Sequence, residues 1–359
     1  MMRCPRLNEI PPPPPGKSGW PWTEESQPLP DVMPDGLPWP RVCIVTPSYN
    51  QGQFIEETIR SVLLQGYPDL EYIIMDGGST DQSLEIIQKY GAWIIYWVSE
   101  PDEGQADAVN KGWQRASGEI LGWINSDDVY SAGAVELAVS TLAASSAIGF
   151  VYGDAQVIDA SGHNISVQKS RPFDLEKLLT FYLSPSQPTV FFRHSLIEAI
   201  GLLDTSLQMS MDTDYWIRLG CVTRGLYIPQ TMADMRTHSE AKTVSRYIEY
   251  FPDSLAILDK TFNDPALPKA MRTLRAKSYS RAHYGAAVRA YQAGVRRPIL
   301  PQVWRSFCLY PHPFELRTYL AVLMCIEALT RTSLLEKLIA IRPRHRLIKL
   351  ISNLLGRAV

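Results

Sequence analysis

The chain has 359 residues, which exceeds the length of one average domain and allows either one large catalytic unit with appendages or two domains. Its net charge of −2 hides an uneven distribution. Residues 270–359 contain 16 of the 35 basic residues and 3 of the 37 acidic residues, so this part carries a net charge of +13. The preceding part therefore carries −15. An acidic body joined to a basic C-terminal region indicates two parts with different tasks.

The five cysteines argue against a disulfide framework and a zinc site, because they are odd in number, widely scattered and lack CxxC or CxxH spacing. This pattern favours a reducing compartment. The N-terminus begins with a short basic stretch and then runs into prolines 11–15 rather than an apolar core, which argues against a secretory signal. We therefore expect a cytoplasmic protein.

Residues 1–40 are rich in proline, which blocks the hydrogen bonding of helices and strands and favours extended, solvated chain. Prolines stand at positions 5, 11–15, 21, 28, 30, 34, 38 and 40. We expect a tail that is flexible or lies on the surface, with Trp20, Trp22 and Trp39 as local anchors. The alternative is a ligand for a proline-recognising domain.

From residue 41 onward, short apolar, β-branched runs alternate with amphipathic stretches at helical spacing, which is typical of βαβ units in a parallel sheet. The predicted strands are residues 42–46, 71–75, 94–98 and 119–124. The predicted helices between them are residues 54–63, 84–87 and 105–116.

Polar residues follow each of the four predicted strands, in the segments 46–50, 76–81, 99–102 and 125–128. In open α/β sheets, ligands bind outside the carboxyl ends of the strands. These four segments are therefore expected to converge on one site.

Five motifs occur in a fixed order: TPSYN, MDGGSTD, EPDEGQADAVNKG, GWINSDD and MDTDYWIRL. This set resembles family 2 glycosyltransferases of the GT-A fold over about residues 41–245. The resemblance implies an α/β fold with a Rossmann-like, mostly parallel sheet flanked by helices. The expected organisation is a Pro-rich tail (1–40), a GT-A glycosyltransferase domain (41–250) and a helical, basic C-terminal region (251–359).

The resemblance implies a divalent metal, Mg²⁺ or Mn²⁺, which neutralises the diphosphate leaving group and favours carboxylate oxygens. It makes Asp127 the primary ligand, Asp128 is expected to share this role, and His238 is expected to contact the metal or the diphosphate. Asn125 stands where the family usually has Asp, so this position contributes no charge. The alternative reading of Asp127 and Asp128 is an N-terminal cap of a helix at residues 132–142.

The resemblance also implies the donor site. Asp76 is expected to accept a hydrogen bond from the nucleobase, and both uracil and guanine offer the imide NH that this needs. The other donor-site residues are expected around the base and ribose or near the diphosphate and sugar: Thr46, Pro47, Tyr49 and Asn50, and Gly104, Gln105, Asn110 and Asp127.

Asp212 is the expected general base, because a sugar hydroxyl is a poor nucleophile until a carboxylate takes its proton. This role predicts single displacement with inversion. Met211 replaces the Glu that the family often has before this Asp. Asp214 is interpreted as a helix-capping residue instead.

Two further regions are predicted. A strand at 150–158, a turn at Ser161-Gly162 and a return strand at 165–168 form a hairpin that we expect on the acceptor side. The C-terminal region is expected to be helical, and residues 334–355 mix apolar and basic side chains. This mixture fits peripheral contact with the inner face of a membrane, or equally a helical subdomain or dimer surface with a solvated basic face. No recognised module supports nucleic-acid binding.

The predicted function is transfer of a hexosyl or related sugar from a UDP- or GDP-sugar to an acceptor hydroxyl, in the EC 2.4 class. The expected acceptor is a glycan or a lipid-linked saccharide in cell-surface glycan or glycolipid assembly. The alternative is a catalytically degenerate sugar-nucleotide-binding protein, suggested by Asn125 and Met211. A nucleotidyltransferase is disfavoured because TPSYN is not a glycine-rich, basic triphosphate loop.

Overall fold

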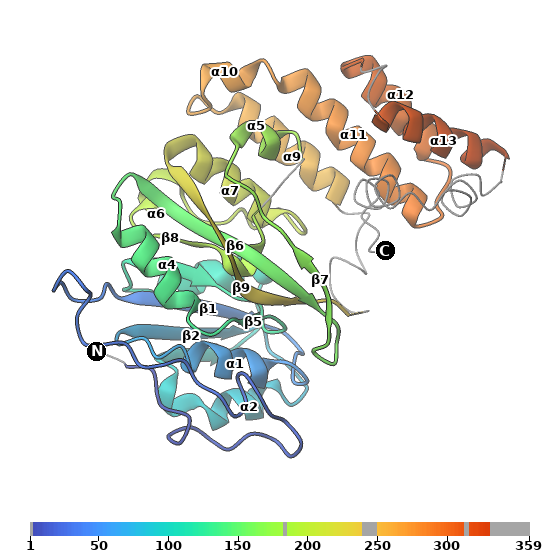
Figure 1. The fold of residues 1–359 in the computed structure, drawn as a ribbon. Coiled ribbons are helices and arrows are strands. Elements are labelled where there is room, and N and C mark those ends of the chain that lie inside the picture. The colour runs from blue at the N-terminus through green and yellow to red at the C-terminus, as the bar shows by residue number, and fades with distance from the viewer. Residues whose placement is uncertain (1–2, 182–184, 239–249, 312–315, 331–359) are drawn as a thin grey trace. The chain divides into compact units, whose positions relative to one another are not determined.

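The computed structural model describes residues 3–181, 185–238, 250–311 and 316–330, which form two compact units (Figure 1). Of these residues, the first unit contains 3–174, 185–207 and 211–238. The second contains 175–181, 208–210, 250–311 and 316–330.

The first unit is built on a nine-stranded sheet with the order β3-β2-β1-β4-β8-β6-β9-β5, in which β7 pairs with β6. The strands are β1 (Val42–Ser48), β2 (Leu70–Asp76), β3 (Tyr96–Ser99), β4 (Ile120–Trp123), β5 (Val129–Tyr130), β6 (Ile148–Ile158), β7 (Asn164–Gln168), β8 (Phe191–Arg193) and β9 (Arg224–Arg236). The predicted parallel strands and the predicted hairpin at 150–168 are confirmed.

Strands β3, β2, β1 and β4 are parallel neighbours, and their register aligns their carboxyl ends. Ser48 lies opposite Asp76, which lies opposite Ser99 on its other side. Val45 of β1 lies opposite Trp123 of β4. The polar segments that follow these strands therefore start from one edge of the sheet.

Helices cover both faces of this sheet. The helices and 3₁₀ turns of the first unit are α1 (Ile55–Leu63), α2 (Ser83–Lys89), η1 (Gly91–Trp93), α3 (Gln105–Trp113), α4 (Ala134–Ala143), η2 (Gln187–Thr189), α6 (Leu196–Ile200) and α7 (Met211–Val222).

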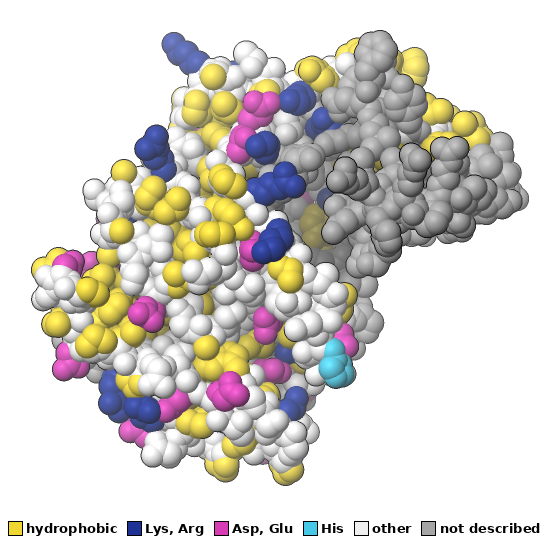
Figure 2. Space-filling view, viewed as in Figure 1, with side chains coloured by type: hydrophobic (Ala, Val, Ile, Leu, Met, Phe, Trp, Pro, Cys, Tyr) yellow, Lys and Arg dark blue, Asp and Glu magenta, His cyan; other side chains and the backbone are white. Residues whose placement is uncertain are grey.

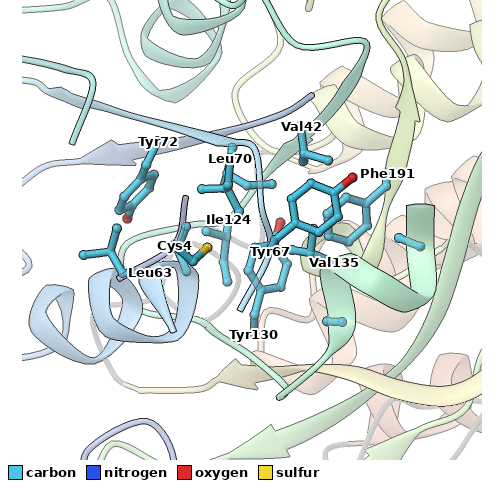
Figure 3. Packing of buried hydrophobic residues seen from close by; sticks show 14 of the residues in the cluster. Cys4, Val42, Leu63, Tyr67, Leu70, Tyr72, Ile124, Tyr130, Val135 and Phe191 are labelled. Carbon is cyan, nitrogen blue, oxygen red and sulfur yellow. The ribbon is translucent and has the colours of Figure 1, made fainter. Parts of the chain in front are cut away.

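The two faces follow from the alternation of side chains along each strand. Val42 and Ile44 of β1 point into a core that also contains apolar residues of α1, α2 and α4; Figure 3 shows part of this packing. On the other face, the rings of Trp113 in α3 and Trp123 in β4 lie 5.4 Å apart. Trp216 of α7 stacks on Trp123, also at 5.4 Å. Helices α3 and α7 are thereby fixed against the end of β4.

Strand β9 was not predicted, because its sequence RGLYIPQTMADMR contains a glycine and a proline and lacks regular alternation. It pairs with β6 in parallel, and this register shifts at several points. Near its carboxyl end, Asp234 lies opposite Val129 of β5. This pairing brings the last residues of β9 to the chain that follows Asn125.

Residues 3–40 pack against the first unit. Cys4, Trp22 and Trp39 are buried, and the amide of Cys4 donates to the carbonyl of Tyr67 at 3.0 Å. The guanidinium of Arg60 in α1 is fully buried and donates to backbone carbonyls of this segment. Its acceptors are Pro11 at 2.7 Å, Pro21 at 3.0 Å and Trp22 at 2.8 Å. The proline-rich segment thus belongs to the same compact unit as the sheet.

The second unit is helical in the residues that the structure describes. Its helices are α5 (Leu175–Leu179), α9 (Tyr250–Asn263), α10 (Lys269–Arg272), α11 (Arg275–Gln292), α12 (Ile299–Leu309) and α13 (Leu316–Thr330). Tyr284 and Val288 of α11, Ile299 of α12 and Met324 of α13 share a small hydrophobic core. No helix within the described ranges is long and apolar enough to span a bilayer. The predicted interfacial segment 334–355 lies outside these ranges.

Candidate active site

Asp76, at the end of β2, organises the turn that follows it. Its carboxylate accepts hydrogen bonds from the Ser79 amide (2.8 Å), the Ser79 hydroxyl (2.6 Å) and the Ser99 hydroxyl (2.7 Å). A carboxylate can accept about four hydrogen bonds, so Asp76 retains some acceptor capacity beyond these three. The side chain is buried, and the Gly77 amide of the turn donates to the carbonyl of Ser48 at the end of β1 at 2.8 Å.

The loop after β1 is joined to this turn through Asn50. Asn50 adopts a left-handed backbone conformation with φ of 52°, which Asn tolerates better than most residues. Its backbone amide donates to the Ser79 hydroxyl (2.8 Å) and its side-chain oxygen accepts from the Thr80 amide (2.9 Å). Asn50 therefore holds two loops together at the predicted nucleotide end of the site.

The other predicted residues of this loop differ in accessibility. Tyr49 is 61% exposed, so its ring is available to a planar base. Pro47 is buried. Thr46 is also buried, and its hydroxyl lies 3.1 Å from the hydroxyl of Tyr72 on the core side of β1. Thr46 therefore supports the loop from the core side of β1.

Polar contacts connect the segment after β3 with the motif after β4. Asp102 accepts a hydrogen bond from the Gly104 amide at 2.8 Å. Gly104 precedes α3, with φ of 113°, a value that favours glycine. At the start of α3, the side-chain amide nitrogen Nε2 of Gln105 donates to the side-chain oxygen of Asn125 at 2.6 Å. Asn125 in turn donates to Asp128 at 3.2 Å.

Asp128 is buried, and both of its oxygens have partners. Oδ2 accepts from Asn125, and Oδ1 accepts from the backbone amide of Arg236 at 2.9 Å. Burial raises the pKa of Asp128 well above its usual value, and the neighbouring charge of Asp127 adds to this. These contacts fit a residue that holds the motif against β9.

Asp127 has a different partner. Its Oδ2 lies 3.1 Å from Nε2 of His238, and 19% of its side chain is exposed. His238 follows β9, and its ring lies 4.9 Å from that of Phe54. Two residues that the sequence analysis assigned to the metal site are therefore in direct contact, although 111 positions separate them.

Arg236 contacts Asp127, Glu57 and Phe54 with its side chain. Its Nε donates to the carbonyl of Asp127 (2.9 Å), its terminal nitrogen lies 2.9 Å from the carboxylate of Glu57, and its guanidinium lies 4.9 Å from the Phe54 ring centroid. Only 1% of its side chain is exposed. Arg236 thus fixes the backbone of Asp127 while its own amide fixes the side chain of Asp128.

The donor set of Asp127 and His238 fits a divalent cation of the Mg²⁺ or Mn²⁺ type. One carboxylate oxygen and one imidazole nitrogen converge, and such cations complete their coordination with phosphate oxygens and water. Among the described residues, no group of three or more His, Cys, Asp or Glu side chains is placed to hold a metal. A metal at this position would therefore need ligands from the diphosphate.

The interpretation of Asp127 and Asp128 as a helix cap is wrong. The chain continues from them into β5, and α4 begins only at Ala134. Both acidic residues instead make their contacts with the end of β9 and with His238.

Asp212 lies in the first turn of α7. Its carboxylate accepts from the Thr213 amide at 2.7 Å, while burial raises its pKa to about 6. Residues four positions apart lie on one face of a helix, and Trp216 of that face stacks on Trp123 of β4. Asp212 therefore lies on the side of α7 that faces the carboxyl end of β4.

Asp214 and Asn110 are tied to the protein itself. Asp214 is buried and its Oδ2 lies 2.7 Å from a guanidinium nitrogen of Arg218, one turn further along α7. Asn110 donates to the carbonyl of Leu203 and accepts from its amide, both at 2.9 Å. These bonds fit a role for Asn110 in positioning α3, whereas its predicted role was contact with the donor.

Arg236 and Glu57 were not predicted from the sequence as residues of the site. One signal was present: Arg236 precedes His238 by two residues, and alternate residues of an extended chain share a side. Glu57 carries no such signal, because an acidic residue in the first turn of a helix is common.

The comparisons with known proteins agree with this architecture. Residues 43–198 match the family model described as Glycosyl transferase family 2. An uncharacterized glycosyltransferase of Mycobacterium tuberculosis is 30% identical over 200 residues, which cover 55% of this chain and 76% of that protein. A putative teichuronic acid biosynthesis glycosyltransferase of Bacillus subtilis is 33% identical over 140 residues, covering 38% and 51%.

Solved structures share the fold. The crystal structure of S. aureus TarS residues 1–349 with UDP-GlcNAc has a TM-score of 0.62 at 17% identity, covering 80% of this chain and 89% of that one. A mannosyltransferase of Pyrobaculum calidifontis, in complex with GDP-Man and Mn²⁺, has a TM-score of 0.55 at 17% identity, covering 87% and 92%. The chain belongs to glycosyltransferase family 2 and is a glycosyltransferase with the GT-A fold.

Proposed function

We propose that the protein transfers a hexosyl or related sugar from a nucleoside-diphosphate sugar to an acceptor hydroxyl, by single displacement with inversion. The observation that carries this proposal is the contact of Asp127 with His238, which gathers an oxygen and a nitrogen ligand at the end of β4. The diphosphate of a sugar nucleotide supplies the further ligands that a cation there requires.

In this proposal Asp212 is the general base. The acceptor oxygen forms a bond to the anomeric carbon while the bond from that carbon to the diphosphate oxygen breaks, and the bonding electrons leave with the diphosphate. The acceptor proton passes to the carboxylate of Asp212. Its pKa of about 6 keeps this group ionised at neutral pH and basic enough to accept a proton. Attack opposite the leaving group inverts the anomeric configuration.

The donor would bind along the carboxyl edge of the sheet. Tyr49 is exposed for stacking on the base, and the remaining acceptor capacity of Asp76 would serve an imide NH. Gly104 and Gln105, at the start of α3, would face the diphosphate or the sugar. Both UDP- and GDP-sugars fit this description, and the two related structures hold UDP-GlcNAc and GDP-Man.

Asp127 and His238 would hold Mg²⁺ or Mn²⁺, with Asp128 and Arg236 positioning Asp127. The bound cation would offset the negative charge that develops on the departing diphosphate. The mannosyltransferase of related fold, which contains Mn²⁺, supports this assignment.

The acceptor class we propose is a glycan or lipid-linked saccharide in the assembly of a cell-surface polysaccharide. The relative named for teichuronic acid biosynthesis supports this class.

A thermal-shift screen tests the donor site. UDP-GlcNAc and GDP-mannose would be added with Mn²⁺ to the native chain, to Asp127→Ala and to Asp69→Ala. Asp69 is the matched control, because it precedes β2 at the opposite edge of the sheet and also pairs with a side chain there. We expect at least one donor to stabilise the native chain and Asp69→Ala in the presence of Mn²⁺, and Asp127→Ala to lose this response. If neither donor stabilises the native chain, or if Asp127→Ala responds like the control, the proposed donor site fails.

A further inference from the structure

Helix α12 exposes a stripe of large apolar side chains. Leu300, Trp304 and Phe307 follow one another at intervals of four and three residues, which places them on one face of the helix. Their exposed fractions are 47%, 67% and 38%. A tryptophan that is two-thirds exposed beside other apolar side chains is unusual on a surface that contacts only water.

Helix α13 packs in the same small core as α12 and also exposes apolar side chains. Val322 is 51% exposed and Leu329 is 69% exposed, and their spacing of seven residues places them on one face. Two neighbouring helices of the second unit therefore each present an apolar stripe. We call the exposed residues of both stripes the apolar surface: Leu300, Trp304, Phe307, Val322 and Leu329.

The sequence around α12 is strongly basic. Residues 265–314 contain no Asp or Glu. Their basic residues are Lys269, Arg272, Arg275, Lys277, Arg281, Arg289, Arg296, Arg297 and Arg305. Arg296 and Arg297 precede α12 directly, Arg305 lies within it, and all three are exposed. The apolar stripe of α12 is thus accompanied by positive charge without acidic neighbours in sequence.

On the face drawn in Figure 2, hydrophobic side chains lie among both acidic and basic ones. Such mixing is typical of a surface that stays in water.

We propose that α12 and α13 form a docking surface for a membrane leaflet that contains anionic lipids. Apolar side chains on a helix that lies in the plane of the membrane enter the boundary between headgroups and acyl chains. Tryptophan prefers this boundary. Arg296 and Arg297, which precede α12, would meet lipid phosphates, and each basic residue near an anionic surface strengthens binding.

The charge argues for lipid and against a second copy of this chain as the occupant. In a symmetric dimer the same patch meets itself, so the positive charge of Arg296 and Arg297 would lie on both sides of the contact. Like charges brought together in this way oppose association. A leaflet with negatively charged headgroups complements the same residues.

The experiment is flotation of the full chain with vesicles. One preparation contains phosphatidylcholine with phosphatidylglycerol as about a third of the lipid, and the other contains phosphatidylcholine alone. The test variant is Trp304→Glu. The matched control is Leu37→Glu, because Leu37 is 61% exposed in the first unit, close to the 67% of Trp304.

We expect the native chain and Leu37→Glu to float with the anionic vesicles. Trp304→Glu should bind these vesicles at least about tenfold more weakly, because it loses an apolar side chain and gains a negative charge that the anionic lipids repel. Binding to the neutral vesicles should be about tenfold weaker than to the anionic ones.

Unchanged flotation of Trp304→Glu overturns the proposal. So does a lower thermal midpoint for this variant than for Leu37→Glu, since the surface would then be covered by the chain itself. Failure of the native chain to float, with a dimer that Trp304→Glu dissociates, assigns the surface to a second copy instead.

Discussion

Asp127 and Asp128 are adjacent in the chain, but their carboxylates have different partners. Asp128 is buried against the backbone of Arg236 and the amide of Asn125, whereas Asp127 is partly exposed and contacts His238. We infer from this that the two residues have different roles, with Asp127 at the diphosphate and Asp128 positioning Asp127. Asn125 fits the same scheme, because its amide bridges Gln105 and Asp128 without needing a charge.

The pKa of Asp212 leads to a prediction about pH. Burial raises it to about 6, so the carboxylate is protonated below that pH and cannot accept the acceptor proton. We expect kcat/KM to fall about tenfold for each pH unit below about 6, and to level off above it. The measurement is the rate of nucleoside diphosphate release across this range, with donor affinity followed in parallel as a control.

The same shift has a defined effect on stability. Because the folded-state pKa lies above the usual value of about 3.9, this group favours folding most below that value, and the contribution is lost as the pH rises through about 6. A fall in rate at low pH therefore does not arise from unfolding caused by Asp212. An acid limb near pH 4, or no limb while donor binding stays constant, would remove Asp212 from the role of base.

At the scale of elements, the parallel half of the sheet could be predicted from sequence because its strands are apolar runs bounded by clear turns. The residues 42–46 and 71–75 are such runs, and both lie within observed strands. Strand β9 could not be predicted, since pairing with β6 and β5 overrides a sequence that lacks strand periodicity. The contact between Asp127 and His238 depends on that strand, so the motifs alone could suggest both residues but not their meeting.

Arg236 tests the structural role of β9. Its buried guanidinium pairs with Glu57 and donates to the carbonyl of Asp127. Replacing it with Met leaves Glu57 without this partner, and we expect Arg236→Met to lower the free energy of unfolding by about 3 kcal/mol. Urea denaturation measures this difference.

Arg224 provides the control, because it begins the same strand and is exposed. Arg224→Met should change stability by less than about 0.5 kcal/mol. Arg236→Met should also weaken Mn²⁺-dependent donor binding, whereas Arg224→Met should not. Equal effects of the two substitutions would show that Arg236 does not hold the site together.

At the scale of the whole molecule, the chain combines a glycosyltransferase unit with a helical unit of different surface character. The proline-rich segment before residue 41 contributes to the first unit, since Arg60 binds three of its carbonyls. Composition predicted an extended chain there but did not indicate that it binds Arg60. Nothing in the sequence distinguishes a helical arginine that is buried from one that is solvated. The second unit adds the apolar surface and the positive charge that we assign to membrane contact.

The most direct test of the central claim is the rate of nucleoside diphosphate release by Asp212→Asn, compared with its donor affinity. The substitution preserves the shape of the side chain and removes the base. We predict donor affinity within about twofold of the native chain and a rate lower by about 100- to 10,000-fold. Native-like turnover by Asp212→Asn, with acceptor present and donor saturating, would contradict a transfer reaction that depends on Asp212.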